Sequence, residues 1–257
     1  MGLIAVTGAS SNIGRAVVSE LVDRGHEVVG LVRQPVRPRD VRYQLSDALD
    51  TAKLRGVKTF VHLAWDRGLR SETTNRIGID QLIHAANEVD AKVILLSTLG
   101  AASPTSRYTK SKSEAEEKVV DSGGTVLRVG LVKGEEPFGL DKALLRFSRF
   151  PLIIRELQSL ESTDLAGLAH ALVDFCVSER PGVFELVSPQ EPKGEAAKEE
   201  IGELGHNESQ RSERNSPVIS LAPIFQVASL VSLKSPVTIS VVDRLATLSS
   251  PRLCRKG

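Results

Sequence analysis

The sequence contains few cysteines, few aromatic residues and almost no net charge. Its two cysteines, Cys176 and Cys254, have no spacing typical of a metal site, so we expect no bound metal and a reducing compartment. Aromatic residues make up 4% of the chain, which argues against a platform that stacks single-stranded nucleic acid. The net charge of +1 gives no electrostatic reason to expect a nucleic-acid partner.

The sequence also lacks an apolar run long enough to span a bilayer clearly. Residues 218–233 are apolar, but Ser, Gln and Pro interrupt them. The wider apolar stretch, 218–248, is compatible with three roles: completing a substrate lobe, pairing with a second subunit in a homodimer, or resting on a membrane surface. The first strand pattern begins at Leu3 and leaves no room for a targeting segment, so we expect a cytoplasmic protein.

The most informative feature present is the stretch LIAVTGASSNIG, residues 3–14. Apolar residues meet Thr7 and Gly8, small residues follow, and an amphipathic pattern continues to Gly25. This order predicts a strand, a tight turn and a helix that a glycine ends. Such a turn suits a pyrophosphate, because small residues allow close approach and the N–H groups at the helix start face the negative charge.

The turn differs from a complete dinucleotide fingerprint at its middle position. Gly8 and Gly14 fit the first and last glycines, whereas Ser11 and Asn12 stand where the middle glycine is expected. Asparagine tolerates a left-handed backbone better than other non-glycine residues, so we expect the turn to form with Asn12. An ordinary turn without a ligand is the alternative.

Strand patterns alternate with helical patterns through residue 187, which predicts an α/β fold with a Rossmann-type doubly wound parallel sheet of about seven strands. Ligands of such sheets bind beyond the carboxyl ends of the strands. The expected strands are 3–6, 26–32, 41–45, 59–64, 93–96, 125–132 and 182–187. The expected helices follow the glycine turn and cover 48–54, 75–87, 111–120 and a stretch from 165.

Arg33 stands at the end of the second expected strand, where dinucleotide enzymes contact the adenosine ribose. An acidic residue there binds the 2′-hydroxyl of NAD, whereas an arginine suits the 2′-phosphate of NADP. The strand end carries no Asp or Glu, so we expect NADP to be preferred over NAD. A solvated surface arginine is the alternative.

A phenol and an ammonium group stand four residues apart in YTKSK, at Tyr108 and Lys112. Residues i and i+4 share one face of a helix, and a nearby ammonium favours the phenolate form. A tyrosine in such a place can exchange a proton with a carbonyl or an alcohol. Ser97 and Thr98 end the fifth expected strand and offer a hydroxyl to hold the substrate oxygen. A solvated helix start without chemistry is the alternative.

Several motifs in family order resemble the short-chain dehydrogenase/reductase superfamily: VTGASSNIG, VVGLVR, FVHLA, NRIGIDQLIHAAN, LLST, YTKSK and VLRVGLVKG. The likeness is to the extended or atypical branch, which includes nucleotide-sugar epimerases and dehydratases. It implies that Thr98 polarises the substrate oxygen, Tyr108 is the acid/base and Lys112 binds the nicotinamide ribose. It also implies a cofactor site formed by Gly8, Ser10, Ser11, Asn12, Ile13, Gly14, Arg33, Gln44, Leu45, Leu63, Ala64, Tyr108 and Lys112.

The sequence departs from the family pattern near the expected site. Gln44 replaces an aspartate that usually contacts adenine, and Tyr108 follows Thr98 by ten positions, fewer than in either main branch. Leu99 and Gly100 supply no acidic group beside Thr98. Dehydration normally needs such a group, so reduction or epimerisation is favoured over dehydration.

The composition divides the chain into two expected parts. Residues 1–188 form the NAD(P)-binding domain, with 133–160 contributing to a substrate cover, and 189–257 form a polar linker followed by a substrate or interaction segment. In the cover, one of Arg146, Arg149 and Arg155 is a candidate contact for an anionic substrate group. Arginines lying along an amphipathic helix are the alternative.

These features predict an NAD(P)-dependent oxidoreductase or epimerase. Its substrate would be a small molecule with a secondary alcohol or ketone, for which a sugar nucleotide is our leading candidate. The alternative function is a non-catalytic NAD(P)H-binding sensor or scaffold, which the irregular glycine turn and the short spacing between Thr98 and Tyr108 favour.

Overall fold

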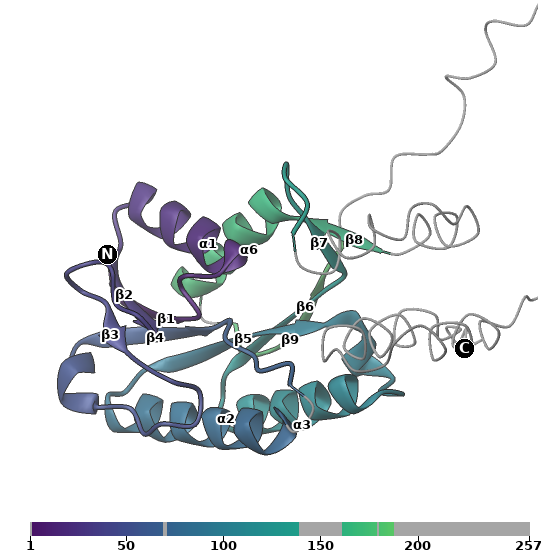
Figure 1. The fold of residues 1–257 in the computed structure, drawn as a ribbon, viewed down its shortest axis with the longest axis horizontal. Helices are drawn as coiled ribbons and strands as arrows, with labels where there is room; N and C mark the ends of the chain where they lie inside the picture. Colours follow the sequence, from purple (N-terminus) through teal and green to yellow (C-terminus); the bar gives the residue numbers. More distant parts are fainter. Residues whose placement is uncertain (1, 69–70, 139–160, 179, 188–257) are drawn as a thin grey trace, which may run out of the picture.

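A computed structural model describes residues 2–68, 71–138, 161–178 and 180–187. In this part of the chain, seven parallel strands form one sheet in the order β3-β2-β1-β4-β5-β6-β9 (Figure 1). The order runs outward from β1 in both directions, as in a doubly wound sheet. The strands are β1 Leu3–Thr7, β2 Glu27–Val32, β3 Val41–Arg42, β4 Val57–His62, β5 Lys92–Thr98, β6 Thr125–Val129 and β9 Gly182–Leu186.

Helices cover both faces of the sheet. Figure 1 shows α1 (Asn12–Asp23) beside α6 (Leu165–Val177) on one face, and α2 (Ser71–Glu88) beside α3 (Arg107–Asp121) on the other. This arrangement confirms the predicted doubly wound fold. It follows from right-handed crossovers between parallel strands, which place successive helices on opposite faces where the strand order reverses.

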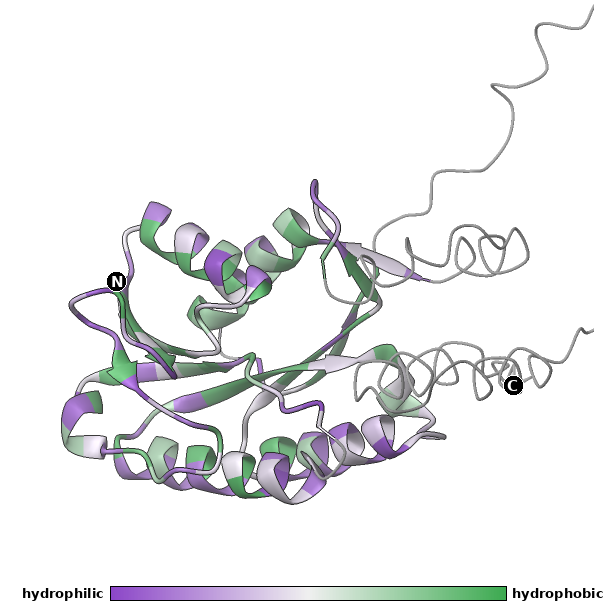
Figure 2. Ribbon diagram, viewed as in Figure 1, coloured by the Kyte–Doolittle hydropathy of each residue, from purple (hydrophilic) through white to green (hydrophobic). Residues whose placement is uncertain are grey.

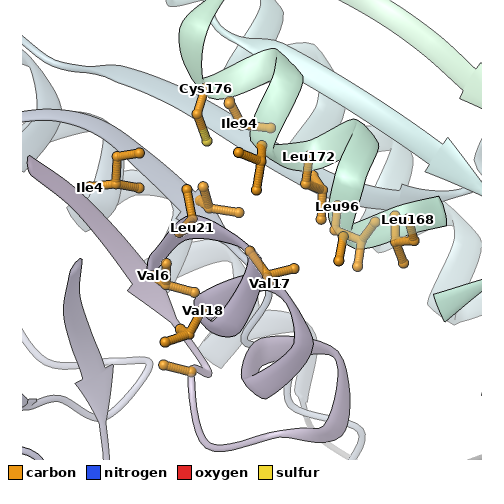
Figure 3. Close-up of a cluster of buried hydrophobic side chains, with 14 of the residues drawn as sticks. Ile4, Val6, Val17, Val18, Leu21, Ile94, Leu96, Leu168, Leu172 and Cys176 are labelled. Atoms are coloured by element: carbon orange, nitrogen blue, oxygen red, sulfur yellow. The ribbon is translucent and has the colours of Figure 1, made fainter. Parts of the chain in front are cut away.

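The two faces of the sheet contribute to two separate hydrophobic clusters. On β1, Ile4 and Val6 pack toward α1 and α6, whereas Ala5 packs toward α2 and α3. Figure 3 shows the first cluster, in which Leu21 of α1 and Leu172 of α6 meet the strands. Strands that are covered on both faces consist of continuous apolar runs. For this reason much of the sheet has the green of hydrophobic residues in Figure 2.

The expected strand 125–132 is wrong in one respect, because it divides into two. β6 ends at Val129, and β7 (Leu131–Lys133) leaves the main sheet to pair in parallel with β8 (Ser162–Asp164). A Cβ atom at Gly130 would lie 2.1 Å from the carbonyl oxygen of Glu161, so only glycine allows the two segments to cross there. The Thr163 hydroxyl stabilises the crossing by accepting a hydrogen bond from the Gly130 N–H and donating one to the Leu186 carbonyl.

Other element boundaries also differ from expectation. The expected helix 48–54 is a 3-10 turn, η1 (Thr51–Leu54), and the third strand is shorter than 41–45. The helix expected from 111 begins four residues earlier, so Tyr108 lies in the first turn of α3. A capping box between Ser106 and Thr109 explains the earlier start, because each side chain accepts a backbone N–H of the other residue.

Most of the expected substrate cover and the whole of 189–257 lie outside the described residues. These include Arg146, Arg149, Arg155 and the apolar stretch 218–248. Among the residues that the structure describes, no helix is long and apolar enough to cross a membrane.

Candidate active site

The glycine turn connects β1 to α1 at the carboxyl end of the sheet. Gly8 has a φ of +68°, and a Cβ atom there would lie 3.0 Å from the backbone nitrogen of Ala64. A Cβ atom at Gly14 would lie 2.2 Å from the carbonyl oxygen of Gly8. Both glycines are therefore required by the structure: Gly8 for a left-handed backbone, and Gly14 for the close approach of α1 to the turn.

The middle of the turn does not need a glycine. Ser11 is the N-cap of α1, with φ −72° and ψ 167°, and its hydroxyl accepts the Gly14 N–H at 3.0 Å. Asn12 is the first helical residue, and Asp90 alone among the described non-glycine residues has a positive φ. The expectation that Asn12 must tolerate a left-handed backbone is thus unnecessary, because the chain enters the helix directly.

Arg15 fixes the side of the turn that faces solvent. Its Nη2 donates to the Asn12 side-chain oxygen at 2.5 Å, and its Nη1 donates to the Ser10 carbonyl at 2.9 Å. The first turn of α1 carries no acidic residue. The N–H groups at the start of α1 and the Arg15 charge therefore combine to favour an anion at this position.

A buried pair, Thr7 and His62, holds the end of β4 against the glycine turn. The Thr7 hydroxyl accepts the backbone N–H groups of Leu63 and Ala64, each at 3.1 Å. Its proton then points to Nδ1 of His62, which lies 2.9 Å away. Burial, followed by the charge of Lys112, lowers the pKa of His62 to about 3, so the imidazole is neutral.

These strand ends enclose a cavity of about 740 Å³, which we call the cofactor cavity. The sequence predicted ten of its lining residues: Gly8, Ser10, Ser11, Asn12, Ile13, Arg33, Gln44, Leu45, Leu63 and Ala64. It missed eight others: Leu31, Val32, Tyr43, Trp65, Asp66, Arg67, Thr74 and Phe138. Of these eight, the sequence could have indicated Trp65, because the chain's single tryptophan directly follows the strand-end motif FVHLA.

Thr98, Tyr108 and Lys112, which we call the β5–α3 site, lie on neighbouring elements. Thr98 ends β5 and Tyr108 is half-buried in the first turn of α3. Lys112 is 5% exposed and donates from Nζ to the Leu96 carbonyl at 2.8 Å. The same Nζ lies 3.7 Å from the ring centroid of Trp65. Within the described residues, the lining of the cofactor cavity includes Trp65 but not the β5–α3 site or Gly14.

A second polar network, which the sequence reasoning missed, joins β5, α3 and β6 next to the β5–α3 site. Glu116 of α3 is 3% exposed and accepts hydrogen bonds from the Ser97 hydroxyl and from Arg128 of β6. The Arg128 Nη2 lies 2.6 Å from a Glu116 carboxylate oxygen. Because the Ser97 hydroxyl is committed to Glu116, Thr98 is the better of the two candidates to hold a substrate oxygen. An acidic residue one helical turn after Lys112 was the available signal.

The part of the chain that the structure describes contains no group of three or more His, Cys, Asp or Glu side chains able to hold a metal ion. The described cysteine, Cys176, is a buried thiol in the cluster of Figure 3. Burial raises the pKa of this thiol to about 12, against a smaller opposite effect of Lys92. Cys176 is therefore a packing residue, inert at neutral pH.

A family model described as NAD(P)H-binding matches residues 8–136. Among proteins of known sequence, a ceramide reductase from Caulobacter vibrioides is 30% identical over 205 residues, which cover 72% of this chain and 64% of the reductase. An uncharacterized protein from Mycobacterium bovis is 27% identical over 202 residues, which cover 73% of this chain and 22% of that protein. The chain thus spans less than two thirds of the length of these relatives.

Solved structures share the fold at low sequence identity. A UDP-N-acetylglucosamine 4-epimerase from Bacillus cereus superposes with a TM-score of 0.59 at 20% identity, covering 74% of this chain and 76% of the epimerase. A dTDP-glucose 4,6-dehydratase from Bacillus anthracis, solved with NAD, gives a TM-score of 0.58 at 15% identity, covering 73% and 76%. At these identities the likeness concerns the fold alone.

Proposed function

The chain belongs to the NAD(P)H-binding family, with the fold of epimerase/dehydratase-like short-chain dehydrogenase/reductases, and we propose that it is an NADP-preferring oxidoreductase. Its substrate class would be a secondary alcohol or ketone. The family match supports an NAD(P)H-binding domain, and the likenesses to a ceramide reductase and to an epimerase support an oxidoreductase or epimerase type. The cofactor preference, the reaction and the substrate are our proposals.

The observation that carries the proposal is the composition of the cofactor cavity. Its walls come from the carboxyl ends of β1, β2 and β4, where doubly wound sheets bind their ligands. The turn at Gly8 and Ser11 supplies an anion-binding helix start, and Arg33 supplies a cation at the end of β2. A dinucleotide whose pyrophosphate lay at the turn would place its adenosine near Arg33.

In a reduction, bound NADPH would supply the hydride to the carbonyl carbon of the substrate. Tyr108 would give its phenolic proton to the carbonyl oxygen, so that the ketone gains one hydride and one proton and becomes an alcohol. Thr98 would donate a hydrogen bond to the same oxygen and hold it in place. Lys112, oriented by the Leu96 carbonyl, would favour the phenolate that Tyr108 becomes.

Two substrate classes fit this chemistry. The Bacillus cereus structure is that of an enzyme named for a sugar nucleotide, whereas the Caulobacter relative is named for ceramide. We favour a sugar nucleotide or a similar polar carbonyl compound, because the cavity lining carries Asp66, Arg67 and Thr74 beyond the glycine turn. A panel should include both classes.

A non-catalytic NADPH sensor is the second candidate. It is favoured by the position of Lys112, whose ammonium contacts Trp65 and the Leu96 carbonyl, and by the absence of the β5–α3 site from the described cavity lining. In that case the cofactor would bind and no substrate would turn over.

The test compares wild type with Tyr108→Phe for NADPH binding and for turnover of a panel of ketones and sugar nucleotides. We expect similar NADPH affinities and a loss of turnover of about 10²- to 10⁴-fold, the usual contribution of a positioned acid. Lys112→Met should also reduce turnover, and Lys110→Met is its matched control, since Lys110 is exposed on the same helix. Binding without turnover in wild type would favour the sensor, and equal turnover in wild type and Tyr108→Phe would remove Tyr108 from the mechanism.

A further inference from the structure

The segment 33–42, which comprises the loop after β2 and the short strand β3, carries four arginines and one acidic residue in the sequence RQPVRPRDVR. We call this segment the arginine loop. It crosses the edge of the sheet next to the cofactor cavity, and both Arg33 and Arg42 lie at its ends. The four arginines are chemically alike, so their surroundings must decide what each of them does.

Two of the four arginines are neutralised by carboxylates. Arg37 binds Asp40, with Nη2 at 2.9 Å and Nε at 3.0 Å from the same oxygen. Asp40 also accepts the backbone N–H groups of Val36 and Arg37, so it ties the loop together. Burial raises the pKa of Asp40, but these hydrogen bonds together lower it below its ordinary value, so the carboxylate stays charged. Arg39 binds Glu27 of β2 at 2.5 Å.

The other two arginines, Arg33 and Arg42, form no salt bridge with any residue that the structure describes. They line one cavity of about 540 Å³ together with Gln34, Pro35, Tyr43 and Gln44. None of these lining residues, all from the described part of the chain, is acidic. The strand pairing brings their backbones close together, because Arg42 pairs with Val32, the residue before Arg33.

This smaller cavity continues the cofactor cavity, because Arg33, Tyr43 and Gln44 line both. The end of β2 is where a dinucleotide places its adenosine ribose. Two like charges that line one hollow repel each other, and an anion bound between them would offset this repulsion. A phosphate monoester carries a charge of about −1.5 to −2 at neutral pH and accepts hydrogen bonds from guanidinium forks.

We propose that Arg42 is a second ligand of the 2′-phosphate of NADPH, and that it selects NADPH over NADH together with Arg33. This inference rests on the proposed function, which assigns dinucleotide binding to the adjoining cavity. It assigns a specific task to each arginine of the loop: Arg37 and Arg39 shape it, and Arg33 and Arg42 hold the phosphate. Gly30 of β2 makes this shape attainable, since a Cβ atom there would lie 2.3 Å from both Arg37 and Asp40.

The experiment measures dissociation constants of NADPH and NADH for wild type, Arg42→Gln and Arg39→Gln. Arg39→Gln is the matched control, because it removes the same charge from the same loop at an arginine that binds Glu27 and does not line the cavity. We expect Arg42→Gln to weaken NADPH binding about 10- to 100-fold, as for a lost charge-assisted hydrogen bond, and NADH binding by less than about threefold. Arg39→Gln should change the NADPH/NADH ratio by less than about threefold.

A second probe isolates the phosphate from the nicotinamide end of the cofactor. Adenosine 2′,5′-bisphosphate should compete with NADPH better than adenosine 5′-monophosphate in wild type, and this advantage should shrink about 10- to 100-fold in Arg42→Gln, where Arg33 remains. An unchanged NADPH/NADH ratio in Arg42→Gln, or an equal change in Arg39→Gln, would overturn the role of Arg42 while dinucleotide binding stands. If wild type binds neither dinucleotide, both the proposed function and this inference are wrong.

Discussion

At the cofactor cavity and the smaller cavity that adjoins it, the first turn of α1 lines an open hollow, and Arg33 and Arg42 have no carboxylate partner among the described residues. Around β5 and α3, the polar groups instead bind one another: Lys112 binds the Leu96 carbonyl, and Ser97, Glu116 and Arg128 form one network. We propose that the first region receives an anion. The second is a self-contained scaffold that fixes where Thr98 and Tyr108 stand.

This difference explains why the two regions should respond differently to substitution. Polar groups without a protein partner can contribute to the free energy of ligand binding and contribute little to the free energy of unfolding. Buried groups that bind one another contribute to the free energy of unfolding. Trp65 belongs to both regions, because it lines the cofactor cavity and lies over the Lys112 ammonium. We expect the fluorescence of Trp65 to change when the cofactor binds, because this side chain lies between the cofactor cavity and the proposed catalytic residue Lys112.

Removing Glu116 should have the largest effect on stability. Glu116→Ala leaves the Arg128 charge without its main partner at a side chain that is 19% exposed, and we expect a loss of about 3–5 kcal/mol in the free energy of unfolding. Urea denaturation measures this loss. Glu117→Ala is the control, since Glu117 is exposed on the same helix. Equal losses in the two variants would show that the network does not hold α3 in place.

Substitution of Gly14, the third residue of α1, should have the next largest effect on stability. Gly14→Ala places a Cβ atom 2.2 Å from the Gly8 carbonyl oxygen, and we expect about 1–3 kcal/mol of destabilisation together with weaker NADPH binding. Gly167→Ala is a close control. Gly167 is also the third residue of its helix, α6, and also donates its N–H to an N-cap side chain, Asp164 at 2.8 Å.

The two glycines differ in what surrounds them. A Cβ atom at Gly167 would make only an ordinary contact of 3.6 Å with Asp164, so Gly167→Ala should be neutral or stabilising by up to about 1 kcal/mol. Thermal unfolding of both variants checks the contrast. If the two variants lost the same stability, the cost of replacing Gly14 would not come from the close approach of α1 to the turn.

A smaller effect should follow from acidification. His62 has a pKa of about 3 in the folded chain, against about 6.5 when unfolded. The unfolded chain therefore binds one more proton between these values, and stability should fall as pH decreases below 6.5, by at most about 1.4 kcal/mol for each pH unit. Urea denaturation at pH 7.5 and 5.5 measures this slope. His62→Asn, which cannot be protonated in this range, should show a shallower slope, and an unchanged slope would place the titrating group elsewhere.

The sheet and the cofactor cavity could be predicted from the sequence because both follow local patterns. Apolar runs separated by helical periodicity define the strands, and the topology of parallel strands brings their carboxyl ends together. Gly8 and Arg33 are therefore found from sequence position alone. The N-cap role of Ser11 does not follow from the motif, because the absent middle glycine suggests a left-handed residue and not a direct entry into the helix.

Contacts between distant segments could not be predicted in the same way. The cation–π contact joins Trp65 to Lys112, and the buried network joins Glu116 to Arg128, across elements whose relative register the sequence does not reveal. The strand break at Gly130 likewise depends on the Glu161 carbonyl, 31 residues away. The four arginines of residues 33–42 look equivalent in the sequence, and only the structure separates the two that bind carboxylates from the two that line the smaller cavity.

The most direct measurement is a titration of the wild-type protein with NADPH, followed by the fluorescence of Trp65. Trp65 is the single tryptophan of the chain and lines the cofactor cavity, so the tryptophan emission reports the surroundings of this one side chain. A free tryptophan derivative titrated in parallel corrects for light absorbed by NADPH. We predict a saturable change that fits one binding site per chain and that requires a higher concentration of NADH than of NADPH. Emission that follows the free tryptophan derivative at every NADPH concentration would contradict cofactor binding at the glycine turn.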